Sequence, residues 1–416
     1  MAYFCILLKK IFVKILQITP RIPFPLHDGG AICMYNTTKF LSKAGHSVTF
    51  AALNTNKHFV DPAVMSDVCE DIHTTFINTD ISAVAAFKNL FTRLPYNAER
   101  FISADFSALL ESLLKKERFD VINIESIFVA YYIDVIRRFS KAPIVLRAHN
   151  AEYMITERLA KNEKNLLKSG YLHFLSRRMK RFEAGLFKKF DGILAITPDD
   201  AAIIESMGYN GPIAVMPAGV DTKFFSPDPK EDFSKKKMFF FASLEWVPNI
   251  EALQWFMREV FSKIQKLHPD LEFHYGGKSP DERSLVFKNT PGVHFHPNIA
   301  SAPDFMRAHG IQLVPLLSGG GMRVKIIEAM SAGKVIISTN IGAEGIRCKH
   351  DENILIADTA DEFIMQLDRC FKNPDVVQRI SRNARETAVQ YYSWEEQTEV
   401  ALALYHDLLK NNNTIT

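Results

Sequence analysis

Apolar runs of strand length alternate along the chain with longer stretches of helical periodicity. A first series comprises Val13–Thr19, Val48–Leu53, Val121–Ile124, Ile144–Leu146, Ile193–Ile196 and Ile213–Met216. A second series comprises Met238–Ala242, Leu271–Tyr275, Val293–Phe295, Ile311–Leu317, Val335–Ser338 and Ile354–Ile356. Buried runs that alternate with helices are typical of parallel sheets with helical crossovers. The pattern therefore predicts an α/β chain with two doubly wound, Rossmann-like sheets.

The two series are separated by a stretch rich in proline and aspartate, Ser226–Asp232, which has the composition of a linker. A chain of 416 residues also exceeds what one hydrophobic core usually fills. We therefore expect one domain over residues 13–225 and a second over residues 226–390. In open parallel sheets ligands bind beyond the carboxyl ends of the strands, so site residues are expected in the loops that follow them.

A glycine-rich turn follows the strand expected at Ile311–Leu317 and opens a helix. Its glycines would let the backbone approach an anion, and the helix start adds unpaired N–H groups and the positive end of the dipole. Arg323 and Lys325 add formal charge, and Glu328 lies one turn beyond Lys325, placed to accept hydrogen bonds from ligand hydroxyls. A sugar nucleotide offers both phosphate and hydroxyls. The alternative is that the turn binds nothing. The chain has neither the P-loop spacing nor the dinucleotide fingerprint, which disfavours an ATPase and a dehydrogenase.

Three further loops are candidates at strand ends. Gly29 and Gly30 begin a helix after the first strand, which suits either an anion nest or a plain strand-to-helix turn. His149 follows the strand Ile144–Leu146 at its carboxyl end, where either a functional or a merely hydrogen-bonded histidine would fit. The turn Pro217–Asp221 is interpreted equally well as a ligand contact or as a hinge.

Taken together, these motifs resemble the retaining nucleotide-sugar glycosyltransferases of family 4, which have the GT-B fold, two Rossmann-like domains facing a central cleft. The resemblance rests on their order: Gly29–Gly30, Gly45–Val48, Arg147–Asn150, Pro217–Asp221, Trp246–Asn249, Gly319–Glu328 and Asn340–Gly345. The stretch that begins near Tyr392–Trp394 resembles the family's terminal helix, expected over residues 391–410 and crossing back to the first domain.

The resemblance implies transfer of a sugar from a UDP-, GDP- or similar donor to an acceptor hydroxyl, with retention of configuration and without a required metal or other cofactor. Glu328 matches the second glutamate of the family's E-x-x-x-x-x-x-x-E motif and would bind the donor ribose, whereas Gly320 stands at the first. Ser243–Trp246 stands after the first strand of the second domain, where the family usually has an arginine and a lysine. Branches with a G-G-G-x-R-x-K loop share these departures, and there Arg323 and Lys325 would stabilise the departing diphosphate.

On this resemblance, His149 would lie near the donor sugar. The expected catalytic residues are His149, Arg323 and Lys325, and the expected donor-binding residues are Gly29, Gly30, Gly319, Gly320, Gly321, Met322 and Glu328. The expected setting is bacterial-type synthesis of polysaccharide or glycolipid. Two alternatives stay open: a GT-B sugar-nucleotide epimerase, which needs acid and base carboxylates, and an inactive sugar-nucleotide-binding scaffold.

The net charge and the spacing of cysteines and histidines limit the partners and cofactors to be expected. A net charge of +3 without any nucleic-acid-binding signature argues against nucleic acid. Five cysteines without a C-x-x-C pair predict reduced thiols in the cytoplasm and no disulfide framework, and the histidines show no metal-ligand spacing, so no metal site is expected. Met1–Phe12 is apolar but interrupted by lysines and resembles neither a signal peptide nor a membrane anchor.

A cluster of cations in the first half bears on the acceptor. It comprises Lys161, Lys164, Lys168, Arg177, Arg178, Lys180, Arg181, Lys188 and Lys189. Such charge runs usually form a solvated helix face. The alternative is a patch that attaches the enzyme peripherally to an anionic membrane, where it would meet a lipid-linked acceptor.

Overall fold

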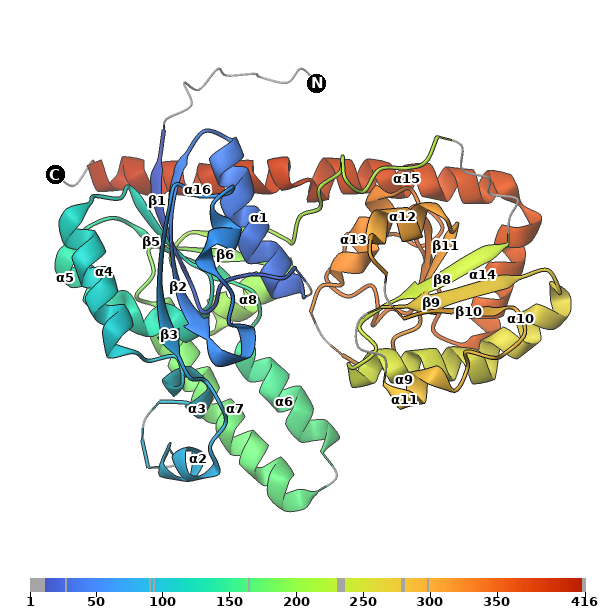
Figure 1. Ribbon diagram of the computed structural model, residues 1–416, viewed down its shortest axis with the longest axis horizontal. Helices are drawn as coiled ribbons and strands as arrows, with labels where there is room; N and C mark the ends of the chain where they lie inside the picture. Colours follow the sequence, from blue (N-terminus) through green and yellow to red (C-terminus); the bar gives the residue numbers. More distant parts are fainter. Residues whose placement is uncertain are drawn as a thin grey trace. The chain divides into compact units, whose positions relative to one another are not determined.

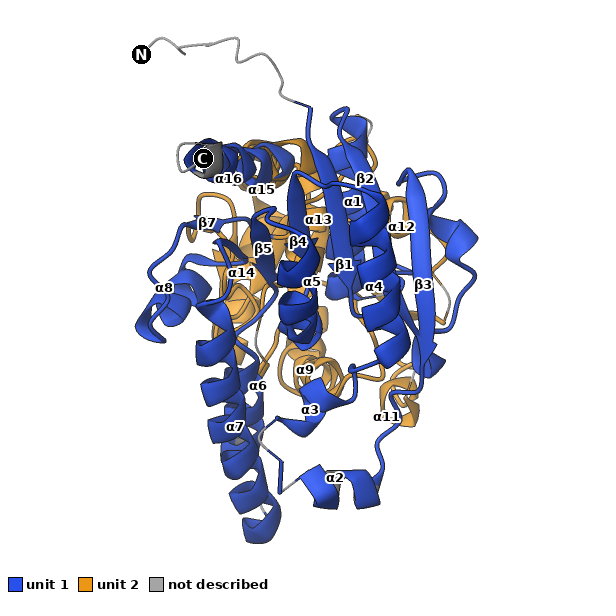
Figure 2. Ribbon diagram, turned by 90° about the vertical axis from the view of Figure 1, so that its left-hand side faces the viewer, with its two compact units in different colours: residues 1–217, 398–416 blue, residues 218–397 orange. Residues whose placement is uncertain are grey.

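The computed structural model describes residues 12–26, 28–89, 91–92, 94–163, 165–229, 236–277, 281–297, 299–319 and 321–413. The chain forms two compact units, one of residues 1–217 with 398–416 and the other of residues 218–397 (Figure 2). Each unit is built on one parallel β-sheet with helical crossovers (Figure 1). The predicted α/β class is confirmed. The expectation for the start of the chain falls on residues 1–11, which lie outside the described residues.

The first unit contains a seven-stranded sheet in the order β3-β2-β1-β4-β5-β6-β7. Its strands are β1 Lys14–Thr19, β2 Ser47–Thr55, β3 Asp71–Ile77, β4 Val121–Ile124, β5 Ile144–Ala148, β6 Gly192–Ala195 and β7 Ile213–Val215. All neighbours pair in parallel. The strand order reverses between β1 and β4, and at such a switch point the loops leave a space for ligands.

The helices of this unit include short 3-10 segments at Asn56–His58, Pro62–Met65 and Ile127–Tyr132. The α-helices are α1 Gly29–Lys43, α2 Ala83–Asn89, α3 Tyr96–Glu99, α4 Ala104–Lys116, α5 Ile133–Phe139, α6 Glu152–Asn162, α7 Leu166–Phe187 and α8 Pro198–Ser206. Alternate residues of one strand enter different cores: Ala51 and Leu53 join the cluster that contains α4 and α5, whereas Phe50 and Ala52 join a smaller cluster with Met65. The sheet is thus covered on both faces.

The edge strand β3 was missed from the sequence. Its residues Asp71–Ile77 mix polar and apolar side chains, and most are only partly buried. Because an edge strand contributes one half-buried row to the core, it does not form the continuous apolar run by which the other strands were predicted.

The second unit repeats the topology. Its sheet has the order β10-β9-β8-β11-β12-β13, which numbers 3-2-1-4-5-6 within the unit. The strands are β8 Lys237–Phe241, β9 Glu272–Gly276, β10 Val293–His296, β11 Ile311–Val314, β12 Val335–Ser338 and β13 Leu355–Ile356. The helices are α9 Val247–Trp255, which continues through a π-helical stretch at Phe256–Phe261 into α10 Ser262–Leu267, then α11 Glu282–Leu285, α12 Ala302–Arg307, α13 Val324–Ser331, α14 Ala360–Lys372 and α15 Pro374–Tyr392.

The last helix, α16 Trp394–Asn413, begins in the second unit, and its residues from Thr398 onward belong to the first. In the first unit it packs on the start of β6. A Cβ atom on Gly192 would lie 2.9 Å from Leu408 Cδ1 and 3.3 Å from Leu404 Cδ2, so a residue without a side chain is needed where the helix crosses the strand. No helix within the described part of the chain is both long enough and apolar enough to span a bilayer.

Candidate active site

The glycine turn lies between β11 and α13, at the carboxyl edge of the second unit's sheet. Gly319 has φ +125° and Gly321 has φ +80°, a region that residues with a side chain rarely adopt. A Cβ atom on Gly319 would lie 2.5 Å from Arg323 Nη2. Because the turn has no side chain at Gly319, its backbone can pass closely over the Arg323 side chain. Gly320 lies outside the described residues.

Arg323 is the residue that precedes the first turn of α13, and it is followed there by Lys325. Its guanidinium lies over the ring of Trp246, 5.0 Å from the ring centroid. Trp246 immediately precedes α9, so the contact joins the loop after β8 to the loop after β11. Met322, which precedes Arg323, is half-buried. A cation is thus held by an aromatic face at the positive end of a helix.

Lys325 and Glu328 lie one turn apart on α13, where Lys325 is half-buried and Glu328 is buried. Lys325 Nζ lies 4.6 Å from the centroid of Phe241, the last residue of β8, and Glu328 is buried. Burial lowers the pKa of Lys325 to about 8 and raises the pKa of Glu328 to about 7, while the attraction between them opposes both shifts. The environment therefore disfavours both charges, and an anion bound beside Lys325 would favour its protonated form.

The start of α1 already contains a carboxylate. Asp28 caps the helix by accepting a hydrogen bond from Ala31 N (3.0 Å), and Arg21 Nη2 donates to both of its oxygens at 2.6 and 2.7 Å. Burial would raise the pKa of Asp28, but the hydrogen bond and charge of Arg21 outweigh it and hold the pKa below its usual value. Gly29 and Gly30, the predicted nest, form the first turn of this helix. An anion at their N–H groups would therefore lie near a bound carboxylate and its arginine.

His149 belongs to a cluster centred on Glu125, which is fully buried directly after β4. Glu125 Oε1 accepts from Gln17 Nε2 (3.3 Å) and Asn123 Nδ2 (2.9 Å). Glu125 Oε2 lies 3.1 Å from His149 Nε2 and 3.9 Å from Arg147 Nε. Side chains from β1, β4 and the end of β5 thus converge on one carboxylate at the switch point of the sheet.

His149 is protonated at neutral pH in this setting. Burial alone would lower its pKa, but hydrogen bonds to Cys33 and Glu125, together with the negative charge of Glu125, raise the pKa to about 9. Its side chain is 18% exposed, so part of the ring faces solvent. A protonated imidazole attracts anions but cannot accept a proton, so the cluster is suited to electrostatic stabilisation and not to general base catalysis.

Arg147, two residues before His149 in the same motif, has a structural role. It is fully buried; Nη1 donates to Met216 Sδ (2.6 Å) and Nη2 donates to Pro217 O (3.3 Å). Arg147 therefore fastens the end of β5 to the segment that follows β7.

The turn Pro217–Asp221 is likewise packed. The Asp221 carboxylate accepts hydrogen bonds from Lys223 N and Phe224 N at 3.2 and 3.1 Å. A Cβ atom on Gly219 would lie 2.5 Å from the indole of Trp394. These contacts favour the structural interpretation of this turn over a ligand contact.

Three polar residues near these sheet edges were not predicted from the sequence as site residues: Arg21, Cys33 and Glu125. For Glu125 a signal existed, because an acidic residue directly after the four-residue buried strand Val121–Ile124 stands where parallel sheets place ligand contacts. For Arg21 and Cys33 the sequence offers no comparable signal.

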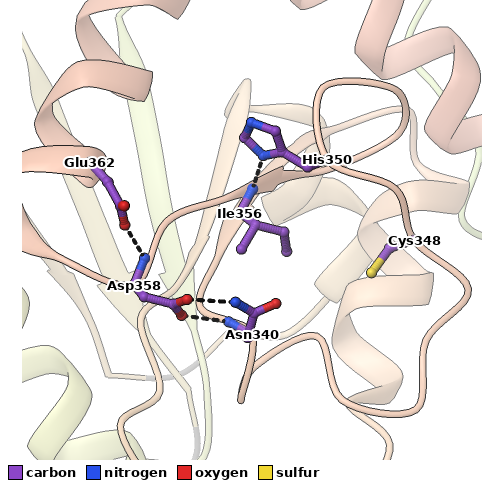
Figure 3. Close-up of a pocket in the computed structure, with 6 residues that line it drawn as sticks. All are labelled: Asn340, Cys348, His350, Ile356, Asp358 and Glu362. Carbon is purple, nitrogen blue, oxygen red and sulfur yellow. Dashed lines mark hydrogen bonds between the residues drawn. The ribbon is translucent and has the colours of Figure 1, made fainter.

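A shallow hollow of about 390 Å³ lies beside the loops that follow β12 and β13 (Figure 3). It is lined by Asn340, Cys348, His350, Ile356, Asp358 and Glu362. Its polar groups are already engaged. The Asp358 carboxylate accepts from Asn340 N (2.8 Å) and Asn340 Nδ2. Glu362 accepts from Thr359 N (3.0 Å) in the capping box of α14 and also from Asp358 N (2.7 Å). These groups serve the helix cap and leave little for a ligand.

The basic cluster has mixed roles. Arg178 donates to the carbonyls of Asn89 (3.1 Å), Thr92 (2.8 Å) and Leu94 (2.7 Å), so it anchors the segment after α2 to α7. Lys168 pairs with Glu163 and Lys189 with Asp134. Lys164 lies outside the described residues. Part of the cluster therefore agrees with the solvated-face interpretation.

Comparison with known proteins matches both units to glycosyltransferase models. Residues 27–224 match the model described as Glycosyltransferase Family 4, and residues 235–373 match Glycosyl transferases group 1. A Klebsiella pneumoniae protein described as an uncharacterized 44.6 kDa protein in the cps region is 24% identical over 382 residues, 89% of this chain and 94% of that one.

Solved structures of similar architecture support the same fold. The sucrose-phosphate synthase of Thermosynechococcus elongatus superposes with a TM-score of 0.69 at 16% identity, over 96% of this chain and 100% of that one. Anabaena HepE in complex with UDP superposes with a TM-score of 0.65 at 13% identity, over 94% and 99%. The two matched stretches together cover most of the chain, so the chain is built of a Glycosyltransferase Family 4 domain followed by a Glycosyl transferases group 1 domain and has the GT-B fold.

Proposed function

We propose that the protein is a retaining glycosyltransferase that moves a sugar from a nucleoside-diphosphate donor to an acceptor hydroxyl, in bacterial-type synthesis of polysaccharide or glycolipid. The observation that carries the proposal is the start of α13, where Arg323, Lys325 and Glu328 gather behind a glycine turn in the unit that matches the group 1 model. The HepE structures contain UDP, UDP with glucose, or UDP-glucose, and the Klebsiella relative is encoded in a cps region.

Charge development explains the arrangement. As the glycosidic bond breaks, negative charge accumulates on the departing diphosphate, so Arg323, Lys325 and the start of α13 stabilise the transition state more than the ground state. Glu328 accepts hydrogen bonds from the donor ribose. The leaving phosphate takes the acceptor proton on the same face of the sugar, which needs neither a protein nucleophile nor a metal ion. Gly29, Gly30 and His149 in the first unit are proposed as donor-side residues on the family resemblance alone.

A thermal-shift panel of the purified protein with UDP, GDP, ADP, dTDP and NAD, each with and without EDTA, tests the donor class. A nucleotide at one hundred times its Kd adds about 2.7 kcal/mol to the stability of the native state, enough to raise Tm by several degrees. Selective stabilisation by UDP or GDP that survives EDTA is expected. A folded protein that responds to no nucleotide would contradict the proposal.

The stereochemistry needs its own measurement. Once the donor class is known, NMR of the glycoside product reports its anomeric configuration, which is compared with that of the donor. Retention is expected. Inversion in an otherwise active enzyme would overturn the retaining mechanism while leaving the transferase assignment intact.

Two helices of the first unit have features that would suit binding to a membrane surface, which bears on the acceptor. In the first unit, α6 and α7 extend beyond the sheet as a hairpin (Figure 1). Leu166 and Leu167, at the start of α7, are 87% and 88% exposed, and cations of the basic cluster lie along the same helices. Apolar side chains flanked by cations are suited to the headgroup region of anionic lipid. We infer that the enzyme works in the cytoplasm, attached peripherally there, on a lipid-linked acceptor.

Liposome sedimentation at low salt distinguishes this surface from a solvated helix face. The parent protein should sediment with vesicles that contain anionic lipid, and a Leu166→Ser/Leu167→Ser variant should sediment much less. Leu267→Ser, at another exposed leucine in the second unit, is the matched control and should behave as the parent. No sedimentation of the parent protein would remove the membrane proposal.

A further inference from the structure

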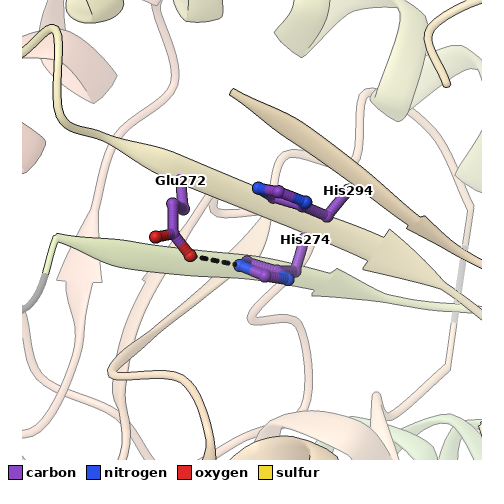
Figure 4. A group of neighbouring side chains, drawn as sticks. All are labelled: Glu272, His274 and His294. Carbon is purple, nitrogen blue, oxygen red and sulfur yellow. Dashed lines mark hydrogen bonds and ion pairs between the residues drawn. The ribbon is translucent and has the colours of Figure 1, made fainter. Parts of the chain in front are cut away.

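A group of histidines lies on one face of the second unit's sheet, and a carboxylate stands beside it at the amino end of β9. Glu272 and His274 occupy alternate positions of β9, so their side chains share a face. His294 of the neighbouring strand β10 is the direct partner of His274 in the strand register. Figure 4 shows the three side chains on these two strands. Two adjacent strands thus present a carboxylate and two imidazoles to one point.

The distances suit a shared ligand. Glu272 Oε2 and His274 Nε2 are 3.1 Å apart, and one potential ligand atom from each of Glu272, His274 and His294 lies within 4.8 Å of the others. Around a tetrahedral zinc ion with Zn–N bonds of about 2.0–2.1 Å, neighbouring ligand atoms are separated by roughly 3.4 Å. A side-chain movement of at most about 1.4 Å at His294, which is exposed, closes the group to that spacing.

We propose that Glu272, His274 and His294 form a binding site for a divalent transition-metal ion of the Zn²⁺ type. Imidazole and carboxylate together suit Zn²⁺, Co²⁺ and Ni²⁺, and three protein ligands leave a fourth position for water. The sequence offered no sign of the site, because its ligands are distributed over two strands as Glu272-Phe-His274 and His294-Phe-His296 and do not form a compact motif.

The neighbours of His274 support this role. His274 Nδ1 lies 3.1 Å from His296 Nε2, so a metal on His274 Nε2 would leave Nδ1–H to donate to His296. The ring of His309 lies 4.1 Å from that of His274, centroid to centroid.

Lys237 on β8 competes with the metal. Lys237 Nζ lies 2.8 Å from Glu272 Oε2, the oxygen that also faces His274. The ammonium neutralises part of the carboxylate charge that would attract a cation. Removing it as Lys237→Met should therefore tighten metal binding.

The site is separate from the proposed chemistry. The glycine turn and the start of α13 lie at the carboxyl edge of this sheet, whereas Glu272 is the first residue of β9 and His294 the second of β10. A metal here would link the edge strand β10 to β9. We therefore expect it to stabilise the second unit without contributing to transfer of the sugar.

Tag-free, chelator-treated protein is titrated with Zn²⁺ by calorimetry and with Co²⁺ while the visible spectrum is recorded. One ion per chain is expected, with the absorption of four-coordinate cobalt. His294→Ala and Glu272→Gln should each weaken binding at least about tenfold. His73→Ala is the matched control, because His73 forms a similar histidine–carboxylate pair with Asp71 on β3 in the first unit. The control should bind as the parent does.

Three results would overturn the site: no binding by the folded parent, equal affinity in the parent and both ligand variants, or a thiolate-to-cobalt charge-transfer band, which would place the ion on cysteine. Lys237→Met adds an independent check with the opposite sign. An affinity for Zn²⁺ that is not increased in this variant contradicts the assignment of Glu272 as a ligand. None of these readouts depends on transferase activity.

Discussion

Replacing Lys325 by methionine separates the chemistry of the α13 site from its packing. Methionine keeps an unbranched apolar stem against Phe241 and removes only the ammonium group. If Lys325 stabilises the departing diphosphate, the change should lower turnover about a hundredfold, the effect of one preorganised transition-state contact, or about 3 kcal/mol of barrier.

The expected effect on stability is different. Contact with the Phe241 ring contributes about 0.5–2 kcal/mol, and its cation–π part is lost in the variant. Against that, burial lowers the pKa of Lys325 to about 8, so folding penalises the protonated ammonium at lower pH, and methionine removes this penalty. The raised pKa of Glu328 lets its carboxyl accept a proton when its partner is removed. At pH 6 the variant should therefore be about as stable as the parent.

The assay pairs slow hydrolysis of the nucleotide sugar, measured as release of the nucleotide, with urea unfolding of the same samples at pH 6. Lys325→Arg, which keeps the charge, should recover part of the turnover. Lys372→Met, which breaks only the surface pair of Lys372 with Asp368, is the matched control and should change neither quantity. A folded Lys325→Met protein with near-normal turnover would refute the reasoning.

Three further predictions concern single residues. Folding raises the pKa of His149 to about 9, so protonated His149 stabilises the fold fully below pH 6.5 and loses this contribution as pH rises through 9; in urea unfolding, the stability advantage of the parent over His149→Gln should shrink across that window. Arg147→Met leaves Glu125 buried without its arginine and should cost about 3–5 kcal/mol of unfolding free energy, part of which Glu125→Gln in the same chain should restore. Gly319→Ala forces a side chain into a left-handed backbone against Arg323, so it should lower the free energy of unfolding by about 1–3 kcal/mol and weaken nucleotide binding. Gly310→Ala is the control, because its Cβ would approach nothing closer than 3.8 Å, and it should change neither quantity in the thermal-shift assay.

Much of the fold follows from the sequence because both sheets are parallel and buried on both faces. Continuous runs such as Val121–Ile124 and Val335–Ser338 became strands with the predicted bounds. The run at Ile311–Leu317 ends as a strand already at Val314, because the following proline has no N–H for the ladder. Strand β3 was missed for the opposite reason, since an edge strand buries too little to form such a run.

The candidate site was predictable only where its residues are neighbours in sequence. Arg323, Lys325 and Glu328 lie within two turns of one helix, so helical spacing was enough to place them on α13. Trp246 and Phe241 reach the same cations from the end of β8, and that proximity depends on strand order, which spacing does not encode. The catalytic and donor-binding roles of these residues stay predictions until the variants are measured.

The directions of two pKa shifts distinguish what the two sheet edges do. In the first unit, Glu125 is already paired with Arg147 and His149 and accepts two amide hydrogen bonds, so the charge on His149 is favoured and its pKa rises. In the second unit, burial disfavours the charge on Lys325 and its pKa falls. A cluster whose charges already satisfy one another gains less from an added anion. A cation held against its own solvation gains a great deal, because the ligand supplies the missing counter-charge. On this reasoning we expect the anionic part of the donor to bind at the start of α13, and we expect the Glu125 cluster to orient the edge on which His149 stands.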